Sequence, residues 1–232
     1  MLDVEVMSMR HAFTLAGASI MALAAYERLF QPWQERWGAT EEEVAAALPG
    51  DDLTAAPAFE RTRAITIDVP PTKVWPWIVQ LGADRGGFYS YDWLENIFGL
   101  DIHNADEIVP AWQHLTVGDV VWADGAQTGG WIVERIVPDQ TLVLKLADVG
   151  RRRATRRDEG VGFEFQWTFA LRPHAARGTR LLVRERVAFG RRLTRLLMAP
   201  IGIVSFGMTR KMLLGIKQRA ERDSTGGQFA AA

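Results

Sequence analysis

The sequence has no cysteine among its 232 residues. Disulfide bonds, a thiolate nucleophile and thiolate metal ligands are therefore excluded, and the redox compartment cannot be read from cysteine usage. Apolar residues make up 48% and charged residues 24% of the chain, which is typical of a globular protein. The length is sufficient for one domain with a full core and an extension.

Sequence motifs of several common chemistries are also missing. The chain has no nucleophile elbow, no phosphate-binding loop and no dinucleotide-binding glycine fingerprint. Asp101, His103, Asp106 and His114 have a spacing that loosely resembles a metal site, but they match no known metal motif. We therefore expect neither a cofactor nor a metal.

Net charge is nearly absent, at −1, but the charges are unevenly distributed. Residues 1–144 contain 8 Lys/Arg and 21 Asp/Glu, whereas residues 145–222 contain 19 Lys/Arg and 6 Asp/Glu. Such asymmetry indicates either an anionic partner or two halves that neutralise each other in space. Five arginines in residues 151–157 are followed by two acids, which favours a solvated loop, and nothing predicts nucleic-acid binding.

Uncharged runs are short, and the longest that could concern a membrane is residues 12–26. As a helix it would span about 22 Å, less than the roughly 30 Å of a bilayer core. Extension to residues 12–33 includes Glu27 and Arg28. The segment is therefore read in three ways: a membrane-contacting helix, a helix packed on protein, or a signal cleaved after residues 22–24. We expect a cytoplasmic protein, with membrane association through this segment as one alternative.

The remaining sequence has a regular order of elements. Thr40 and Glu43 predict a capping box at the start of a short helix. Alternation in residues 65–69 predicts a strand, and Thr72 would cap the helix that follows it. Further strands are expected at residues 117–124, 130–138, 141–147, 161–173 and 179–189. Because no helix separates them, they predict an antiparallel sheet.

The C-terminal region predicts one long amphipathic helix. Its apolar residues recur every three or four positions: Leu197, Ile201, Val204, Met208, Met212 and Ile216. The fold class is therefore α+β, with a curved antiparallel sheet around a terminal helix. We expect a helical extension at residues 1–52, a compact domain at 53–222 and a flexible tail at 223–232.

The strand around residue 167 has an unusually bulky face. Phe163, Phe165, Trp167 and Phe169 all lie on one side of it. The chain also contains nine tryptophans, and large aromatic side chains in such number suggest a wide cavity or an interface. We expect either a cavity or a helix against this face.

Glu185 lies on the apolar side of the next strand, where burial disfavours a charged carboxyl group unless a cation pairs with it. Three interpretations remain open. Glu185 forms a structural ion pair with Arg135 or Lys145, serves as an acid, base or polar ligand anchor, or turns outward at a bulge. The strand at residues 130–138 fits two phases, with either Glu134 or Arg135 facing inward.

Residues 86–104 combine glycines, aromatic residues and acids. A turn at the two glycines precedes a short helix, which Ser90 or Asp92 would cap, with Glu95 at the third position after Asp92. The apolar face of this helix would consist of Trp93, Ile97 and Phe98.

Several segments resemble the SRPBCC (START/Bet v 1-like) superfamily, which includes polyketide cyclases and lipid-transport proteins. They are ITIDVPPTKVWPWIVQLG, LRPHAARGTRLLVRERV and MTRKMLLGIKQRAER. WGATEEEVAAALPGDDL and GGFYSYDWLENIFGLDIHNADEIVPAWQHLTVGDVV are similar to a bacterial subgroup in which a hydrophobic N-terminal segment often precedes the domain. The resemblance covers residues 37 to 222.

This resemblance implies a helix-grip fold, in which about seven antiparallel strands wrap around the C-terminal helix and enclose a hydrophobic cavity. Members bind lipids, sterols, polyketides or plant hormones, and some are cyclases or dehydratases. The segment at residues 86–104 would lie beside the pocket mouth. The candidate ligand-binding residues are Trp75, Tyr89, Tyr91, Trp93, Phe163, Phe165, Trp167, Val183, Glu185, Met208 and Met212.

Two functions follow as hypotheses. The chain binds a hydrophobic small molecule or lipid, or it is a cofactor-independent cyclase or dehydratase acting on an apolar substrate. A third interpretation, without a ligand, is a protein-interaction module with a filled core. The superfamily has no common catalytic motif, so no catalytic residue is carried over from it. The candidate acid/base residues are Glu185, Tyr91, Asp92 and His103. The oligomeric state is not predicted.

Overall fold

The structure is a computed structural model that describes residues 21, 25–160, 162–190 and 201–229. Its helical elements are the π-helical turn η1 (Tyr26–Phe30), α2 (Gln31–Glu35), α3 (Glu41–Ala45), α4 (Pro71–Val79), α5 (Asp92–Ile97), the 3-10 turns η2 (Pro110–Trp112) and η3 (Val149–Arg151), and α7 (Ile201–Phe229). Its strands are β1 (Phe59–Ile67), β2 (Val120–Trp122), β3 (Gly130–Val137), β4 (Thr141–Asp148), β5 (Arg153–Ala154), β6 (Phe163–His174) and β7 (Gly178–Phe189).

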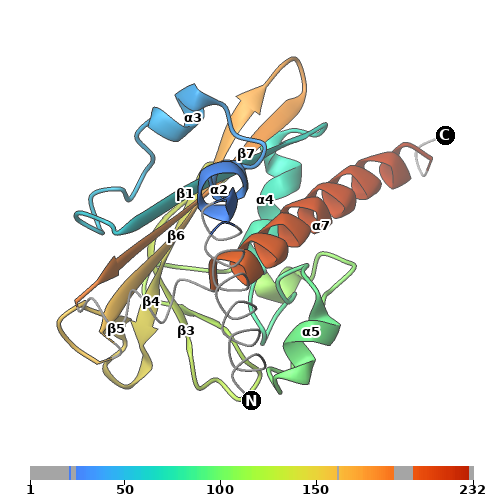
Figure 1. The fold of residues 1–232 in the computed structure, drawn as a ribbon. Coiled ribbons are helices and arrows are strands. Elements are labelled where there is room, and N and C mark those ends of the chain that lie inside the picture. The colour runs from blue at the N-terminus through green and yellow to red at the C-terminus, as the bar shows by residue number, and fades with distance from the viewer. Residues whose placement is uncertain (1–20, 22–24, 161, 191–200, 230–232) are drawn as a thin grey trace, which may run out of the picture.

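The strands form one curved antiparallel sheet in the order β1-β7-β6-β4-β3-β2, and the short β5 pairs with β4. The long helix α7 lies across the concave face of this sheet, with α4 beside it (Figure 1). The main hydrophobic core fills the space between these two helices and the sheet. The predicted α+β class and the helix-grip arrangement with seven strands are confirmed.

The caps predicted at Thr40 and Thr72 have different outcomes. At α3, Thr40 Oγ1 accepts a hydrogen bond from the Glu43 amide at 3.2 Å, and Glu43 Oε2 accepts one from the Thr40 amide at 2.9 Å. The capping box is therefore confirmed. The capping role predicted for Thr72 is wrong, because α4 begins one residue earlier at Pro71, whose fixed φ and missing N–H suit the first helical position.

Strand β1 begins at Phe59, six residues before the alternation predicts, because its first half places charged residues inward. Arg61 and Arg63 lie on the concave side, in register with Glu185 and Val183 of β7. Long polar side chains on an inner face break the apolar alternation from which a strand is recognised. The extension of β1 places two cations in the interior.

Strand β3 uses both of the phases that its sequence allows. A register shift between Val133 and Arg135 interrupts its pairing with β4. Trp131 and Val133 contact the core before this bulge, and Ile136 contacts it afterwards. A bulge inserts one residue and reverses the side-chain alternation, so no single phase describes the strand.

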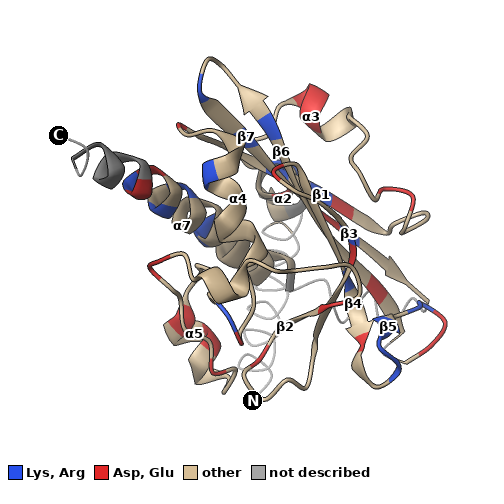
Figure 2. Cartoon of the chain, turned by 180° about the vertical axis from the view of Figure 1, so that it is seen from behind, with Lys and Arg blue, Asp and Glu red and all other residues tan. Residues whose placement is uncertain are grey.

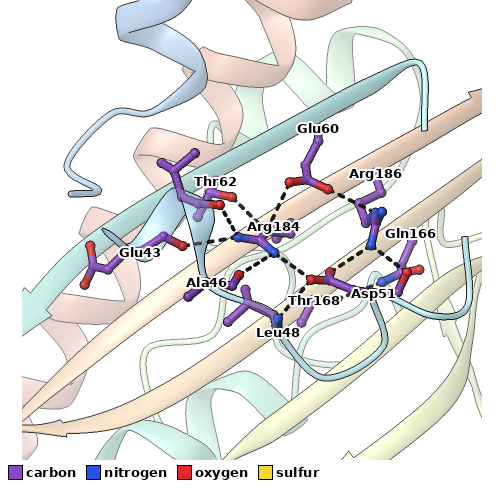
Figure 3. Close-up of polar contacts among 11 residues, drawn as sticks. Glu43, Ala46, Leu48, Asp51, Glu60, Thr62, Gln166, Thr168, Arg184 and Arg186 are labelled. Atoms are coloured by element: carbon purple, nitrogen blue, oxygen red, sulfur yellow. Dashed lines mark hydrogen bonds and ion pairs between the residues drawn. The ribbon is translucent and has the colours of Figure 1, made fainter. Parts of the chain in front are cut away.

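Residues 40–58 cover the convex face of the sheet. Arg184, 2% exposed, donates to the carbonyl oxygens of Val44 and Ala46 at 2.9 and 3.0 Å and pairs with Asp51 at 2.7 Å (Figure 3). Arg180 pairs with Glu43 at 2.7 Å in the same layer. Acids of the first half of the chain thus meet cations of the second half, as Figure 2 also indicates. The charge asymmetry is largely neutralised in space.

The arginine-rich loop at residues 151–157 is neutralised locally. Arg151 pairs with Asp148 at 2.7 Å, Arg153 pairs with Glu159, and Arg157 lies 3.8 Å from Glu164. These pairs are mostly exposed. The loop therefore does not present five free cations to a partner.

The helical extension packs against both the helix and the edge of the sheet. Trp33 in α2 contacts the ring of Phe206 in α7, with centroids 5.2 Å apart. The Ala64 amide on the outer edge of β1 donates to the carbonyl oxygen of Trp37 at 3.1 Å. Residues 12–20 and 22–24 of the candidate membrane segment lie outside the described residues. In the part of the chain that the structure describes, no helix is sufficiently long and apolar to cross a bilayer.

Candidate functional site

A cavity of about 300 Å³ lies between the concave face of the sheet and α7. It is large enough for a small organic molecule and lies at the lower end of typical ligand pockets. Its lining is mostly apolar. The lining residues are Phe88, Ser90, Glu95, Leu100, Ile102, Ala123, Trp131, Phe165, Trp167, Glu185, Ser205, Met208, Thr209 and Met212.

One wall of the cavity is aromatic. Trp167 and Phe165 alternate with outward-facing residues along β6, and Trp131 lies beside them on β3. The rings of Trp131 and Trp167 are 5.5 Å apart, and Phe88 packs against both at 5.7 and 6.3 Å. Both indole Nε1 atoms are buried without a hydrogen-bond partner among the described residues. The wall therefore offers broad ring faces to the cavity.

The opposite wall comes from α7. Met208 and Met212 are one helical turn apart and so face the same way, and Ser205 and Thr209 extend this side toward β7. Methionine side chains adapt to the shape of what they pack against. This wall can therefore adjust to different apolar groups.

Glu185 occupies one end of the cavity as part of a buried ion pair. Its Oε1 accepts from Arg63 at 2.8 Å and from Thr209 Oγ1 at 2.8 Å, while Ser205 Oγ donates to Oε2 at 3.1 Å. Arg61 lies 3.9 Å from the same carboxylate. Arg63 is only 1% exposed. The carboxylate is thus fully engaged by its own chain.

An ion pair was one of the three interpretations of Glu185, but the partners named for it, Arg135 and Lys145, are wrong. Arg135 pairs with Asp52 at 3.4 Å, and Lys145 pairs with Glu164 at 3.2 Å on the convex side. The partners come from β1 instead, since β1 neighbours β7 directly and extends far enough to carry them.

Glu95 on α5 is the second carboxyl group of the cavity. The side chain is 7% exposed, and Oε2 is buried without a hydrogen-bond partner among the described residues. Burial, and to a smaller extent the negative charge of Asp92, raises the pKa of Glu95 to about 7. This group can therefore gain or lose a proton near neutral pH.

Helix α5 is oriented opposite to the expectation. The predicted apolar face is exposed, with Trp93 at 62%, Ile97 at 69% and Phe98 at 75%. The predicted capping by Ser90 or Asp92 with Glu95 is also wrong. The N-cap is Tyr91 without a side-chain cap, and Glu95 points to the interior instead of back to the helix start. The local sequence carries no signal for this orientation, because the spacing of residues 92–98 favours the cap and the apolar face that were predicted.

The loop that carries Phe88 and Ser90 is held by specific contacts and lies close to α7. Asn104 accepts from the Tyr89 amide at 2.6 Å and donates to the Ser90 carbonyl at 3.1 Å. A Cβ atom at Gly215 of α7 would lie 2.5 Å from the Tyr89 carbonyl oxygen. Only glycine permits this close approach of the loop to the helix.

A second, more polar pocket of about 440 Å³ lies on the outer side of this loop. Tyr91, Asp92 and Trp93 line it from α5 and the residue before it, and Lys211 lines it from α7, with its ammonium 5.8 Å from the Tyr91 ring centre. Ser90 contributes to both pockets. The loop at residues 88–90 therefore separates an apolar inner cavity from a polar outer pocket.

The structure brings five of the eleven candidate ligand-binding residues to the inner cavity: Phe165, Trp167, Glu185, Met208 and Met212. Three line the outer pocket: Tyr89, Tyr91 and Trp93. The other three lie in neither: Trp75 packs against the core, Val183 is buried within it, and Phe163 packs against Phe189.

The candidate acid/base residues are dispersed. Glu185 lines the inner cavity but is paired, Tyr91 and Asp92 line the outer pocket, and His103 is exposed with its ring nitrogen 3.1 Å from Asp101. Within the described residues, no three His, Asp or Glu side chains converge as metal ligands would. Sequence reasoning missed Glu95, Trp131, Ser205 and Thr209 as lining residues.

No protein-family model and no curated protein matches this chain. Solved structures with partial similarity include a protein from Mesorhizobium loti, at 17% identity and a TM-score of 0.37, covering 70% of this chain and 98% of that one. A protein from Arthrobacter aurescens has 16% identity and a TM-score of 0.41, covering 71% and 87%. Norcoclaurine synthase from Thalictrum flavum has 10% identity and a TM-score of 0.40, covering 69% and 84%.

Proposed function

We propose that this protein binds an apolar small molecule or a lipid in the cavity between the sheet and α7. The observation that carries the proposal is the cavity of about 300 Å³ with an aromatic wall on one side and methionines on the other. Native cores are close-packed and contain few voids larger than a water molecule, so an apolar space of this size is more than a packing defect. A ligand that fills it buries apolar surface against both walls.

The proposal is tested by native mass spectrometry of the protein purified from its own host, followed by extraction and identification of any bound molecule. A cavity-filling variant, Met208→Trp, should lose the bound molecule. Val204→Trp is the matched control, because Val204 lies on the same helix but is 57% exposed and does not line the cavity. Retention of the ligand by a folded Met208→Trp protein would contradict the proposed location.

A cofactor-independent enzyme is the second candidate, and Glu95 is the observation that favours it. A buried carboxyl group with a pKa of about 7 exchanges protons readily near neutral pH, as a general acid or base must. In such an enzyme, Glu95→Gln should lower turnover by about 10²- to 10⁴-fold while substrate binding is retained. Equal turnover by the variant would exclude this role.

Membrane association through residues 12–33 is a separate proposal. Four large apolar side chains in the described part of this segment are exposed: Met21, Leu29, Phe30 and Trp33. Carbonate extraction of membranes from cells that express the full chain distinguishes the outcomes. Full release of the uncleaved chain would rule out an inserted anchor.

A further inference from the structure

The inner cavity contains one carboxyl group for which the chain supplies no partner. Glu185 has Arg63, Ser205 and Thr209 around it, whereas Glu95 Oε2 has no hydrogen-bond partner among the described residues. A buried carboxyl group without a partner is costly, and a bound molecule that pairs with it would relieve that cost. The cavity therefore contains a buried carboxyl group, that of Glu95, that a ligand could pair with.

The chemistry of a matching group follows from what surrounds it. None of the lining residues is Lys, Arg or His. Phe88, Trp131 and Trp167 form a continuous wall of ring faces in the same cavity. Aromatic faces carry negative potential and attract cations, and indole does so most strongly. An ammonium group would find both a carboxylate and aromatic faces here.

The segment of the chain that carries α5 is acidic, although Lys211, Arg219 and Arg222 of α7 line the outer pocket beside it. Residues 86–134, which provide α5, the loops around it and β2, contain no Lys or Arg. They contain eight acids: Asp92, Glu95, Asp101, Asp106, Glu107, Asp119, Asp124 and Glu134. Asp106 is neutralised by Arg219 at 3.0 Å, but the acidic residues on and around α5 remain numerous (Figure 2). Clefts lined by one sign of charge concentrate ligands of the opposite sign.

We propose that the ligand of this cavity is an apolar molecule with a cationic amine or quaternary ammonium group, which binds between Glu95 and the aromatic wall. This inference rests on the proposed function and specifies the class of ligand. The apolar part would lie against Met208 and Met212, and the charged part would replace the missing partner of Glu95.

Protonation gives this proposal a distinct pH dependence. Of the ionisable groups near Glu95, Asp92 lies on the same helix, Glu185 on β7 is paired with Arg63, and Lys211 on α7 lines only the outer pocket. Because the pKa of Glu95 is raised to about 7, the carboxylate forms mainly above neutral pH. A permanent cation should therefore bind more weakly at pH 6 than at pH 8, whereas a neutral isostere should show no such change.

The test measures calorimetric dissociation constants for three probes: 1-naphthylmethylamine, (1-naphthylmethyl)trimethylammonium and 1-naphthalenemethanol. At pH 8 the two cations should bind about tenfold more tightly than the neutral alcohol. In Glu95→Gln this preference should fall to about onefold. Glu107→Gln is the matched control, since it removes an exposed carboxylate from the same stretch without altering the cavity, and it should retain the preference.

Each outcome has a separate meaning. If the alcohol binds as tightly as the cations, or if Glu107→Gln abolishes the preference as fully as Glu95→Gln, the cation proposal is wrong while the cavity remains a binding site. If none of the probes binds, the proposed function fails, and the cation proposal fails with it. Thermal unfolding of Glu95→Gln shows that the variant is folded, and a neutral amide at this position should not destabilise it.

Discussion

Replacing Arg63 with methionine provides the sharpest test of how the interior is stabilised. Methionine retains most of the aliphatic length of arginine but removes the charge and all donors. The variant loses the 2.8 Å ion pair with Glu185, the 2.9 Å hydrogen bond to the Gln34 carbonyl oxygen and the packing of the guanidinium on Phe206. It leaves Glu185 buried, with Arg61 at 3.9 Å as its nearest remaining cation.

The expected magnitude follows from burial. Both partners are almost fully buried, with side chains 1% and 3% exposed. Breaking a buried ion pair by removing one partner costs about 3–5 kcal/mol, because the other charge remains in a poorly solvated site. In a domain of this size each kcal/mol shifts Tm by about 2–4 °C, so Tm should fall by roughly 6–20 °C. Arg61→Met should cost only about 1 kcal/mol, since that arginine is farther away and more exposed.

The assay is thermal and urea unfolding followed by circular dichroism for Arg63→Met, Arg61→Met and the double variant Arg63→Met/Glu185→Leu. Removing both charges also removes the stranded carboxylate, so the double variant should be more stable than Arg63→Met alone. Two results would refute this reasoning. One is a loss below about 1 kcal/mol in Arg63→Met, and the other is a double variant at least as unstable as the single one.

Three further perturbations have defined outcomes. The folded-state pKa of Glu95, about 7, is above its unfolded value of 4.5, so its contribution to stability is complete below pH 4.5 and is lost as pH rises to about 7. In urea unfolding across pH, the free energy of unfolding of Glu95→Gln should therefore exceed that of the parent by up to about 3 kcal/mol above pH 7, and the two should be equal near pH 4. Gly215→Ala should destabilise the fold by about 1–3 kcal/mol, because its Cβ atom would lie 2.5 Å from the Tyr89 carbonyl oxygen. The Cβ atom of the control Gly207→Ala on the same helix meets nothing within 4 Å, so this variant should be neutral or stabilised by up to about 1 kcal/mol, and equal Tm values for the two variants would contradict the reasoning. The hydrogen bond from Arg180 is the main cause that lowers the pKa of Glu43. In the same urea series, Glu43→Gln should lose about 1 kcal/mol of unfolding free energy above pH 4.5, and this loss should shrink as pH falls through the folded-state pKa of Glu43.

Much of the fold could be predicted from the sequence because most strands alternate cleanly. Strand β6 carries large apolar side chains at every second position, and its register in the sheet follows that pattern. The order of elements then requires an antiparallel sheet around a terminal helix. Where the alternation fails, the start of β1 was predicted too late, and no single phase could be predicted for β3.

The candidate site was harder to predict because it depends on contacts between distant segments. The inward direction of Glu185 follows from alternation, but its partner Arg63 lies 122 residues away and is identified only by the pairing of β1 with β7. Glu95 was read as a helix cap because local spacing favours one. In the folded chain α5 packs with Glu95 toward the interior, and the neighbouring apolar residues Trp93, Ile97 and Phe98 are exposed.

The pairing of β1 with β7 also determines when the fold can close during synthesis. Strand β1 leaves the ribosome early, while its partner is made 122 residues later. At about 5–20 residues per second, β1 waits roughly 6–24 s before Arg63 can meet Glu185. During that interval its outer edge can be covered by residues that precede it, through the contact of Ala64 with Trp37, but its inner edge remains open. The nascent chain therefore has an unpaired strand edge until nearly the whole domain is made, and an unpaired edge is prone to pair with another chain.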